Sequence, residues 1–132
     1  MLIKHHIITG TAISLFLLFF TQINITSAII FLATSILIDV DHYLAYWQKT
    51  KDYSTSYKKI KKWCLTKGTT MEIYFIFHNI WFLTILIALV KYNAVFTPVL
   101  LGVSLHYICD SIWDVYWYKR GLIKKPYRRW II

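Results

Sequence analysis

Long apolar stretches alternate with short polar or basic segments along this chain. The apolar stretches are about Ile7–Ile23, about Ile25–Ile38, Ile73–Val90 and Ala94–Cys109, and the last continues into the aromatic run Trp113–Tyr118. A helix needs about 20 residues to cross the hydrocarbon core of a bilayer, so the first two stretches are long enough only with their polar flanks. The pattern predicts an all-α integral membrane bundle of about four transmembrane helices.

The composition agrees with this pattern. Of 132 residues, 58% are hydrophobic and 18% are aromatic, and the mean hydropathy is +0.51, well above the values of an ordinary soluble domain. We expect one membrane-embedded domain over residues 1–132. It would carry a basic loop at about 48–71 and a basic tail at about 119–132.

The net charge of +9 is concentrated in that loop and tail. Basic clusters next to apolar helices are typical of contact with anionic lipid headgroups. Membrane lipids are therefore the expected partners, and nucleic acid is not. A run such as Lys58–Lys62 could also do no more than set the topology and solvate a loop.

The positions of lysine and arginine orient the bundle, because loops rich in these residues stay cytoplasmic. Lys4 precedes the first stretch, and the hairpin after it, about Gln22–Ser27, carries no charge. The basic loop follows the second stretch, and Lys91 alone separates the third from the fourth. We expect a multi-pass protein of the cell membrane with both termini cytoplasmic, and we interpret the N-terminal stretch as a helix rather than a cleaved signal.

This topology brings ionisable residues from four distant segments to one membrane face. They are His5 and His6, Asp39 to His42, Glu72 to His78, and His106 to Asp114. Placing a charge in hydrocarbon costs roughly 2.5 to 3.5 kcal/mol on insertion scales, so ionisable residues there are candidates for a functional site. The topology itself was inferred from lysine and arginine alone, which makes the convergence informative.

Two pairs of residues in this layer have the spacing of metal ligands. Asp39 and His42 are three apart, and His106 and Asp110 are four apart, so each pair would share one face of a continuing helix. Imidazole and carboxylate together suit zinc, iron or manganese. We expect a divalent metal, with zinc first among the candidates. The alternative for His106 and Asp110 is a hydrogen-bonded pair inside the bundle.

Four further residues could complete the site. His78 is expected within about two turns of the start of the third helix, at the depth of the pairs. His5 and His6 point to different helix faces, and we choose His6 as the inward one. Asp41 could be a ligand or a general base. Glu72 could be catalytic, although a carboxylate at a helix N-terminus is also favoured by the helix dipole alone.

Asp114 and the two cysteines are assigned ordinary roles. Asp114 could extend the site, but Lys119 and Arg120 are nearby in the sequence and are the expected ion-pair partners. Cys64 and Cys109 are too few for a disulfide framework, and neither belongs to a C-x-x-C motif. We expect both to be free thiols.

These residues also form recognisable motifs. Leu37–His42 reads L-I-D-V-D-H, and His106 to Asp110 forms H-x-x-x-D, with Gly102 ahead of it. In these motifs the chain resembles the small membrane-bound metal-dependent hydrolases of the LexA-binding inner-membrane type. It is more distantly similar to the zinc-dependent phospholipase C group. The resemblance implies hydrolase chemistry and places the family's early histidine on His5 or His6.

The chain departs from the family pattern at three positions. The family's second motif is L-P-D-x-D-H, and Ile38 replaces its proline. The third motif is H-R-G-x-T-H-S. If His78 matches its second histidine, Ile73 stands in place of the first and Asn79 in place of the serine. One ligand or substrate contact would then be missing.

Two other classes of function fit a membrane bundle. A metal or proton transporter places ionisable groups near the bilayer midplane. A non-catalytic membrane subunit requires no convergence of histidines and acids. Because the sequence predicts convergence at one face, we expect a metal-dependent hydrolase that acts on a phosphoester or lipid-linked substrate at the cytoplasmic interface. The expected catalytic residues are Asp41 and Glu72, and the expected ligands are His6, Asp39, His42, His78, His106 and Asp110.

Overall fold

A computed structural model describes residues 3–53, 55–66 and 76–121, and over these residues the chain is helical with no strand. The elements are α1 (Ile3–Phe20), α2 (Ile25–Leu37), α3 (Val40–Thr50), α4 (Tyr57–Thr66), α5 (Ile80–Tyr92), the 3-10 turn η1 (Ala94–Phe96) and α6 (Thr97–Lys119). The all-α bundle predicted from the apolar pattern is confirmed.

Three helical spans are long and apolar enough to cross a membrane: Ile3–Phe20, Ile25–Thr50 and Ala94–Lys119. The fourth expected crossing corresponds to α5, which is apolar but has 13 residues. Its first part was expected from Ile73, and residues 73–75 lie outside the described residues. The length and composition of these helices are consistent with a multi-pass membrane protein.

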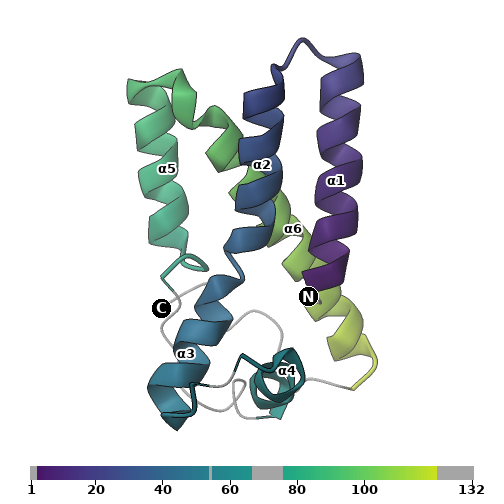
Figure 1. The fold of residues 1–132 in the computed structure, drawn as a ribbon, viewed down its shortest axis with the longest axis vertical. Helices are drawn as coiled ribbons and strands as arrows, with labels where there is room; N and C mark the ends of the chain where they lie inside the picture. Colours follow the sequence, from purple (N-terminus) through teal and green to yellow (C-terminus); the bar gives the residue numbers. More distant parts are fainter. Residues whose placement is uncertain (1–2, 54, 67–75, 122–132) are drawn as a thin grey trace.

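α1 and α2 form an antiparallel hairpin, α6 packs against both, and α5 packs against α6 (Figure 1). Glycines allow this close packing. A Cβ atom on Gly102 would overlap the Thr34 hydroxyl and lie 2.5 Å from the Phe31 carbonyl oxygen, and one on Gly10 would lie 2.6 Å from the Ser35 hydroxyl. Small residues of this kind let backbones approach within a membrane bundle. As a result, α1 and α6 both lie directly against α2.

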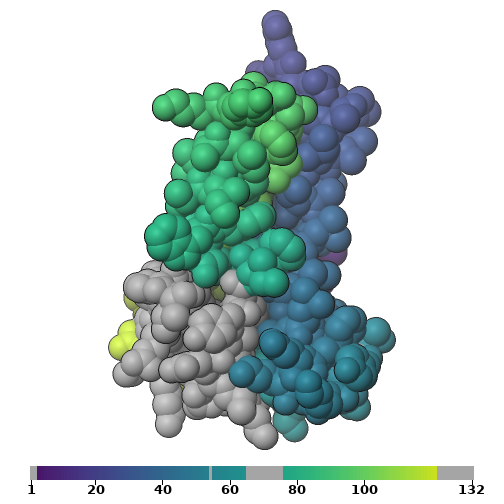
Figure 2. All heavy atoms as spheres, turned by 90° about the vertical axis from the view of Figure 1, so that its left-hand side faces the viewer, coloured from purple at the N-terminus to yellow at the C-terminus, as the bar shows by residue number. Residues whose placement is uncertain are grey.

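The outer surface of the bundle is apolar. Ile8 and Phe19 of α1, Ile29 of α2, and Trp81 and Ile85 of α5 are all exposed. Figure 2 shows the face on which α5 lies over the upper part and α3 lies to its lower right. Large apolar side chains exposed on several helices of a small bundle are typical of contact with lipid rather than water.

The chain bends between α2 and α3. Turn-like backbone bonds replace the helical pattern here, from Asp39 N–H to the Ile36 carbonyl at 3.2 Å and from Asp41 N–H to the Ile38 carbonyl at 3.3 Å. The Asp39 side chain makes no capping bond at the start of α3, and the residue is 4% exposed. The bend therefore turns a carboxylate into the bundle.

The segment expected to be a basic loop, residues 48–71, contains a helix. α4 packs on α3 because Ile60 and Trp63 are buried against Ala45 and Tyr46. Lys58, Lys59 and Lys62 lie on its exposed side. The three-residue spacing of Ile60 and Trp63 gives α4 one apolar face. In the expected tail, α6 extends to Lys119, and residues 122–132 lie outside the described residues.

Candidate metal centre

Six of the expected site residues meet at one end of the bundle. His6 comes from α1, Asp39 from the α2–α3 bend, His42 from α3, His78 from the turn before α5, and His106 and Asp110 from α6. The start of α1, the end of α2 and the start of α5 all lie at the same end, and α6 crosses behind them (Figure 1). Five of the six are no more than 4% exposed, and the His42 side chain is 16% exposed.

The ligand atoms form two overlapping groups. One group contains His6, Asp39, His106 and Asp110, and the other contains Asp39, His42, His78 and Asp110. Within each group, one nitrogen or oxygen atom of every residue lies within 4.8 Å of the others. Asp39 and Asp110 belong to both groups. The arrangement could therefore hold one divalent ion, or two ions that share the two carboxylates.

In the first group, two stacked imidazoles face the carboxylates. The rings of His6 and His106 lie 3.8 Å apart between centroids and are nearly parallel. His6 Nε2 lies 3.1 Å from Asp110 Oδ1. His106 Nε2 lies 3.5 Å from Asp110 Oδ2 and 3.6 Å from Asp39 Oδ1. Nitrogen and oxygen atoms from α1, α6 and the α2–α3 bend thus surround one small volume.

The second group approaches the same carboxylates from the other side. His42 Nε2 lies 3.4 Å from Asp39 Oδ1, and His78 Nε2 lies 3.7 Å from Asp110 Oδ2. His78 Nε2 is also only 2.9 Å from His106 Nε2. For comparison, bonds of about 2.05 Å in a tetrahedral zinc site separate the ligand nitrogens by about 3.3 Å.

The other nitrogen of each of these two rings is already engaged. His106 Nδ1 lies 2.8 Å from the Ser35 carbonyl oxygen, which can only accept a hydrogen bond. His78 Nδ1 lies 3.3 Å from Asp41 Oδ2, and an ionised carboxylate likewise only accepts. Both Nδ1 atoms therefore carry their hydrogens. In the neutral rings the two Nε2 atoms present lone pairs to each other, and they repel unless a proton or a cation lies between them.

Burial favours the neutral form of His78. Desolvation lowers its pKa to about 4, against the opposing effect of the Asp41 carboxylate. At neutral pH the ring therefore has a lone pair on Nε2 available for an ion. This histidine lies outside the membrane-spanning segments, in the turn before α5.

The donor set fits a divalent cation. Asp39 Oδ1 is buried and has no hydrogen-bond partner among the residues that the structure describes, although the His42 and His106 nitrogens lie at 3.4 and 3.6 Å. A cation would neutralise this oxygen and separate the facing nitrogens. Each group offers four nitrogen or oxygen donors, the usual number for zinc, and iron and manganese accept the same donors. Among the described residues, neither group includes a cysteine.

Outside the ligands, three contacts hold the His78 turn in place. Asp41 Oδ2 accepts hydrogen bonds from the backbone N–H of Phe77 at 2.5 Å and of His78 at 3.1 Å. The Tyr107 hydroxyl donates to the Phe77 carbonyl. Asp41 belongs to neither ligand group, so its observed role is to orient His78. Contacts of this kind set the ring orientation of a metal ligand.

The structure distinguishes His6 from its neighbour. His6 is buried among the ligands, whereas the His5 ring stacks on Trp113 at 4.5 Å. His78 was expected on the third helix but precedes it, because Asn79 caps α5 by accepting a bond from the Trp81 N–H. Glu72 lies outside the described residues.

Several contributors had no clear signal in the sequence. Ser35 acts through its carbonyl oxygen, which no side-chain pattern reveals. The Cys64 Sγ atom lies 3.9 Å from His42 Nδ1, a contact that depends on how α4 folds onto α3. Asp114, for which Lys119 and Arg120 were the expected ion-pair partners, is 2% exposed. Of the residues that support the candidate ligands, only Tyr107 has a signal in the sequence, which is its position directly after His106.

No family model, curated protein or solved structure matches this chain.

Proposed function

We propose that this protein is a membrane-bound metal-dependent hydrolase that cleaves a phosphoester, in a lipid or a lipid-linked substrate, at the cytoplasmic interface. The observation that carries the proposal is the pair of facing nitrogens, His78 Nε2 and His106 Nε2, 2.9 Å apart and next to the Asp110 carboxylate. With both Nδ1 hydrogens committed elsewhere, this geometry suits a bound cation. Zinc is the first candidate on donor type.

The chemistry follows from the donor set. A divalent ion held by imidazole and carboxylate lowers the pKa of bound water towards about 7 and polarises a phosphoryl oxygen. Asp39 and Asp110, which belong to both groups, would be ligands whether one ion or two bind. His6, His42, His78 and His106 complete the ligand set. Asp41 keeps His78 Nε2 directed at the centre.

The place of the cluster supports an enzyme over a transporter. Three of the elements that supply ligands, α1, α2 and the turn before α5, do so at their ends and at the same end of the bundle (Figure 1). A transporter would instead need ionisable groups near the bilayer midplane. Lys4 at the start of α1 and the lysines of α4 lie toward the same end of the bundle as the ligands (Figure 1). Because lysine-rich segments stay cytoplasmic, this supports a cytoplasmic site with both termini inside.

The convergence also argues against a purely structural role. Burial of two carboxylates and three imidazoles at no more than 4% exposure is costly unless they are compensated. A structural subunit would gain the same packing from apolar residues at these positions. The polar cluster is therefore better explained by a bound ion and its reaction.

The test is metal-dependent turnover by the purified protein in lipid nanodiscs. Phosphoester hydrolysis should disappear with a chelator and return with added zinc, iron or manganese. Asp110→Asn should abolish it, because Asp110 belongs to both ligand groups. His5→Gln is the matched control and should leave turnover unchanged. Turnover that survives both chelation and Asp110→Asn would contradict the proposal.

A further inference from the structure

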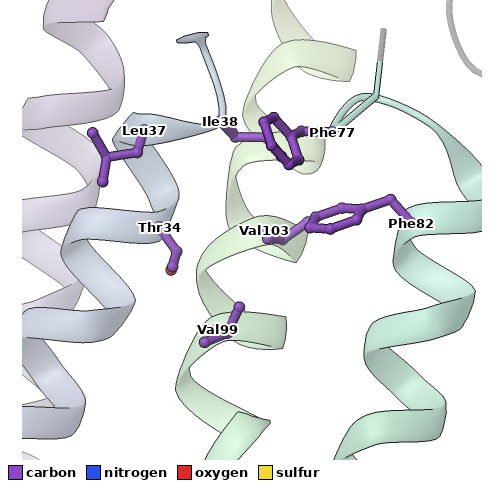
Figure 3. Close-up of a pocket in the computed structure, with 7 residues that line it drawn as sticks. All are labelled: Thr34, Leu37, Ile38, Phe77, Phe82, Val99 and Val103. Atoms are coloured by element: carbon purple, nitrogen blue, oxygen red, sulfur yellow. The ribbon is translucent and has the colours of Figure 1, made fainter. Parts of the chain in front are cut away.

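An apolar pocket of about 170 Å³ lies between α2, α5 and α6. Figure 3 shows its lining residues, which are Thr34, Leu37, Ile38, Phe77, Phe82, Val99 and Val103. The Thr34 hydroxyl donates within its own helix, to the Ile30 carbonyl at 2.8 Å. Among the described lining residues, no other side chain carries a polar group, so the pocket suits a hydrocarbon occupant.

The pocket adjoins the metal centre at one end. Ile38 directly precedes the ligand Asp39, and Phe77 directly precedes the ligand His78. Val103 lies three residues before His106 on the same face of α6. In Figure 3, Ile38 and Phe77 lie together at one end of the pocket, and Val99 lies at the other. The pocket therefore runs from the metal centre along α6, away from the ligands.

The pocket has an edge that faces the lipid side of the bundle. Leu37 at the pocket edge is 63% exposed, and the walls belong to apolar helices. The spans Ile25–Thr50 and Ala94–Lys119 are long and apolar enough to cross a membrane, and both carry ligands. Lipid chains would therefore contact the helices that supply the site. Whatever enters this pocket from the bilayer is an apolar chain.

We propose that the pocket seats the acyl chain of a phosphate-bearing lipid substrate whose phosphate lies at the metal centre. This inference rests on the proposed hydrolase function and names its substrate class. A cavity of about 150 Å³ accepts a benzene-sized group, so the pocket has room for several methylene groups next to the phosphate. The chain supplies binding energy, and the ligand cluster takes the anionic head.

The test fills the pocket without touching a ligand. Val99→Trp places an indole in the far end of the pocket. Leu101→Trp is the matched control, because Leu101 lies two residues along α6, is 44% exposed and does not line the pocket. The probe is a non-hydrolysable long-chain phosphonate lipid, and its affinity is measured in nanodiscs alongside turnover of a water-soluble phosphoester without an acyl chain.

The expected result distinguishes binding of the acyl chain from binding of the phosphate. Val99→Trp should weaken phosphonate binding by at least about tenfold, the loss expected when two buried methylene groups leave an apolar site. Its metal content and its turnover of the soluble phosphoester should stay at the wild-type level, and Leu101→Trp should change none of them. Equal binding by both tryptophan variants, or no binding of the phosphonate by the wild type, would overturn the pocket assignment.

A second variant covers the case in which Val99→Trp does not fold. Phe82→Ala enlarges the pocket and should raise the affinity for a methyl-branched chain relative to a straight chain. An unchanged ratio would overturn the assignment.

The experiments distinguish failure of the hydrolase proposal from failure of the pocket proposal. Chain binding that depends on Val99, without any hydrolysis, would remove the hydrolase function alone, whereas hydrolysis with no effect of Val99→Trp on binding would remove the pocket alone.

Discussion

His78 Nε2 lies 2.9 Å from His106 Nε2, although one residue precedes α5 and the other lies in the middle of α6. Behind the rings, Asp41 and the Ser35 carbonyl hold the two Nδ1 atoms. Each ring is thus fixed in the tautomer that turns its lone pair towards the other. Together with the neighbouring carboxylates, these nitrogens could hold a cation.

Replacement of His6 should lower the metal content, and replacement of His5 should not. His6 Nε2 lies 3.1 Å from Asp110 Oδ1, whereas the His5 ring stacks on Trp113. His6→Ala and His5→Ala are adjacent, chemically identical changes, so each is the control for the other. Metal per purified protein is measured by mass spectrometry. Equal losses in the two variants would contradict the assignment of His6 as a ligand.

Asp41→Asn should weaken metal binding without removing a ligand. Loss of the carboxylate leaves His78 less firmly oriented, and changes at such supporting residues typically cost about 10- to 100-fold in metal affinity. Affinity is measured by competition with a chromophoric chelator. Asp52→Asn is the control, since Asp52 accepts a bond from the Tyr46 hydroxyl at the start of the α3–α4 connection. An affinity unchanged in Asp41→Asn would contradict the orienting role.

Gly102→Ala should destabilise the bundle by about 1–3 kcal/mol, the usual range for overpacking. The added Cβ would overlap the Thr34 hydroxyl and lie 2.5 Å from the Phe31 carbonyl oxygen, so α6 would have to move away from α2. Thermal unfolding in detergent measures the loss. Thr34→Ala in the same chain should recover part of the stability, and full stability of Gly102→Ala alone would show that the helices are not in close contact there.

The topology predicts opposite sides for two reporter fusions. Asn93 lies between α5 and η1, at the end of the bundle away from the ligands (Figure 1). A reporter inserted at Asn93 should report the outside, and one at the C-terminus should report the cytoplasm. Reporters on the same side would remove the basis for a cytoplasmic site.

Much of the fold could be predicted because apolar length is a strong signal. α1, α2 and α6 fall in three of the expected stretches. Asp39 and His42 still share one side of the chain despite the bend between α2 and α3, because the His42 N–H donates to the Asp39 carbonyl at 3.1 Å. α4 was missed because its ten residues carry four lysines, and their charge obscured the apolar spacing of Ile60 and Trp63.

The convergence of the candidate ligands could be predicted from the sequence, but the contacts that support them could not. Charged residues within apolar stretches stand out, so His6, His106 and Asp110 could be identified from sequence alone. The placement of His78 before α5 depends on the Asn79 cap and on backbone bonds to Asp41, which join residues 36 and 37 positions apart. Contacts over such separations follow from packing, which the local pattern does not encode.

The central claim is that these residues hold a divalent ion, and the metal content of the purified protein tests it most directly. The wild type, isolated without chelators and then titrated with zinc, should bind one or two equivalents tightly. The double variant His42→Ala, His106→Ala removes one imidazole from each ligand group and should bind none tightly, while His5→Ala should match the wild type. Tight stoichiometric metal in the double variant, or a wild type that binds no divalent ion, would contradict the account.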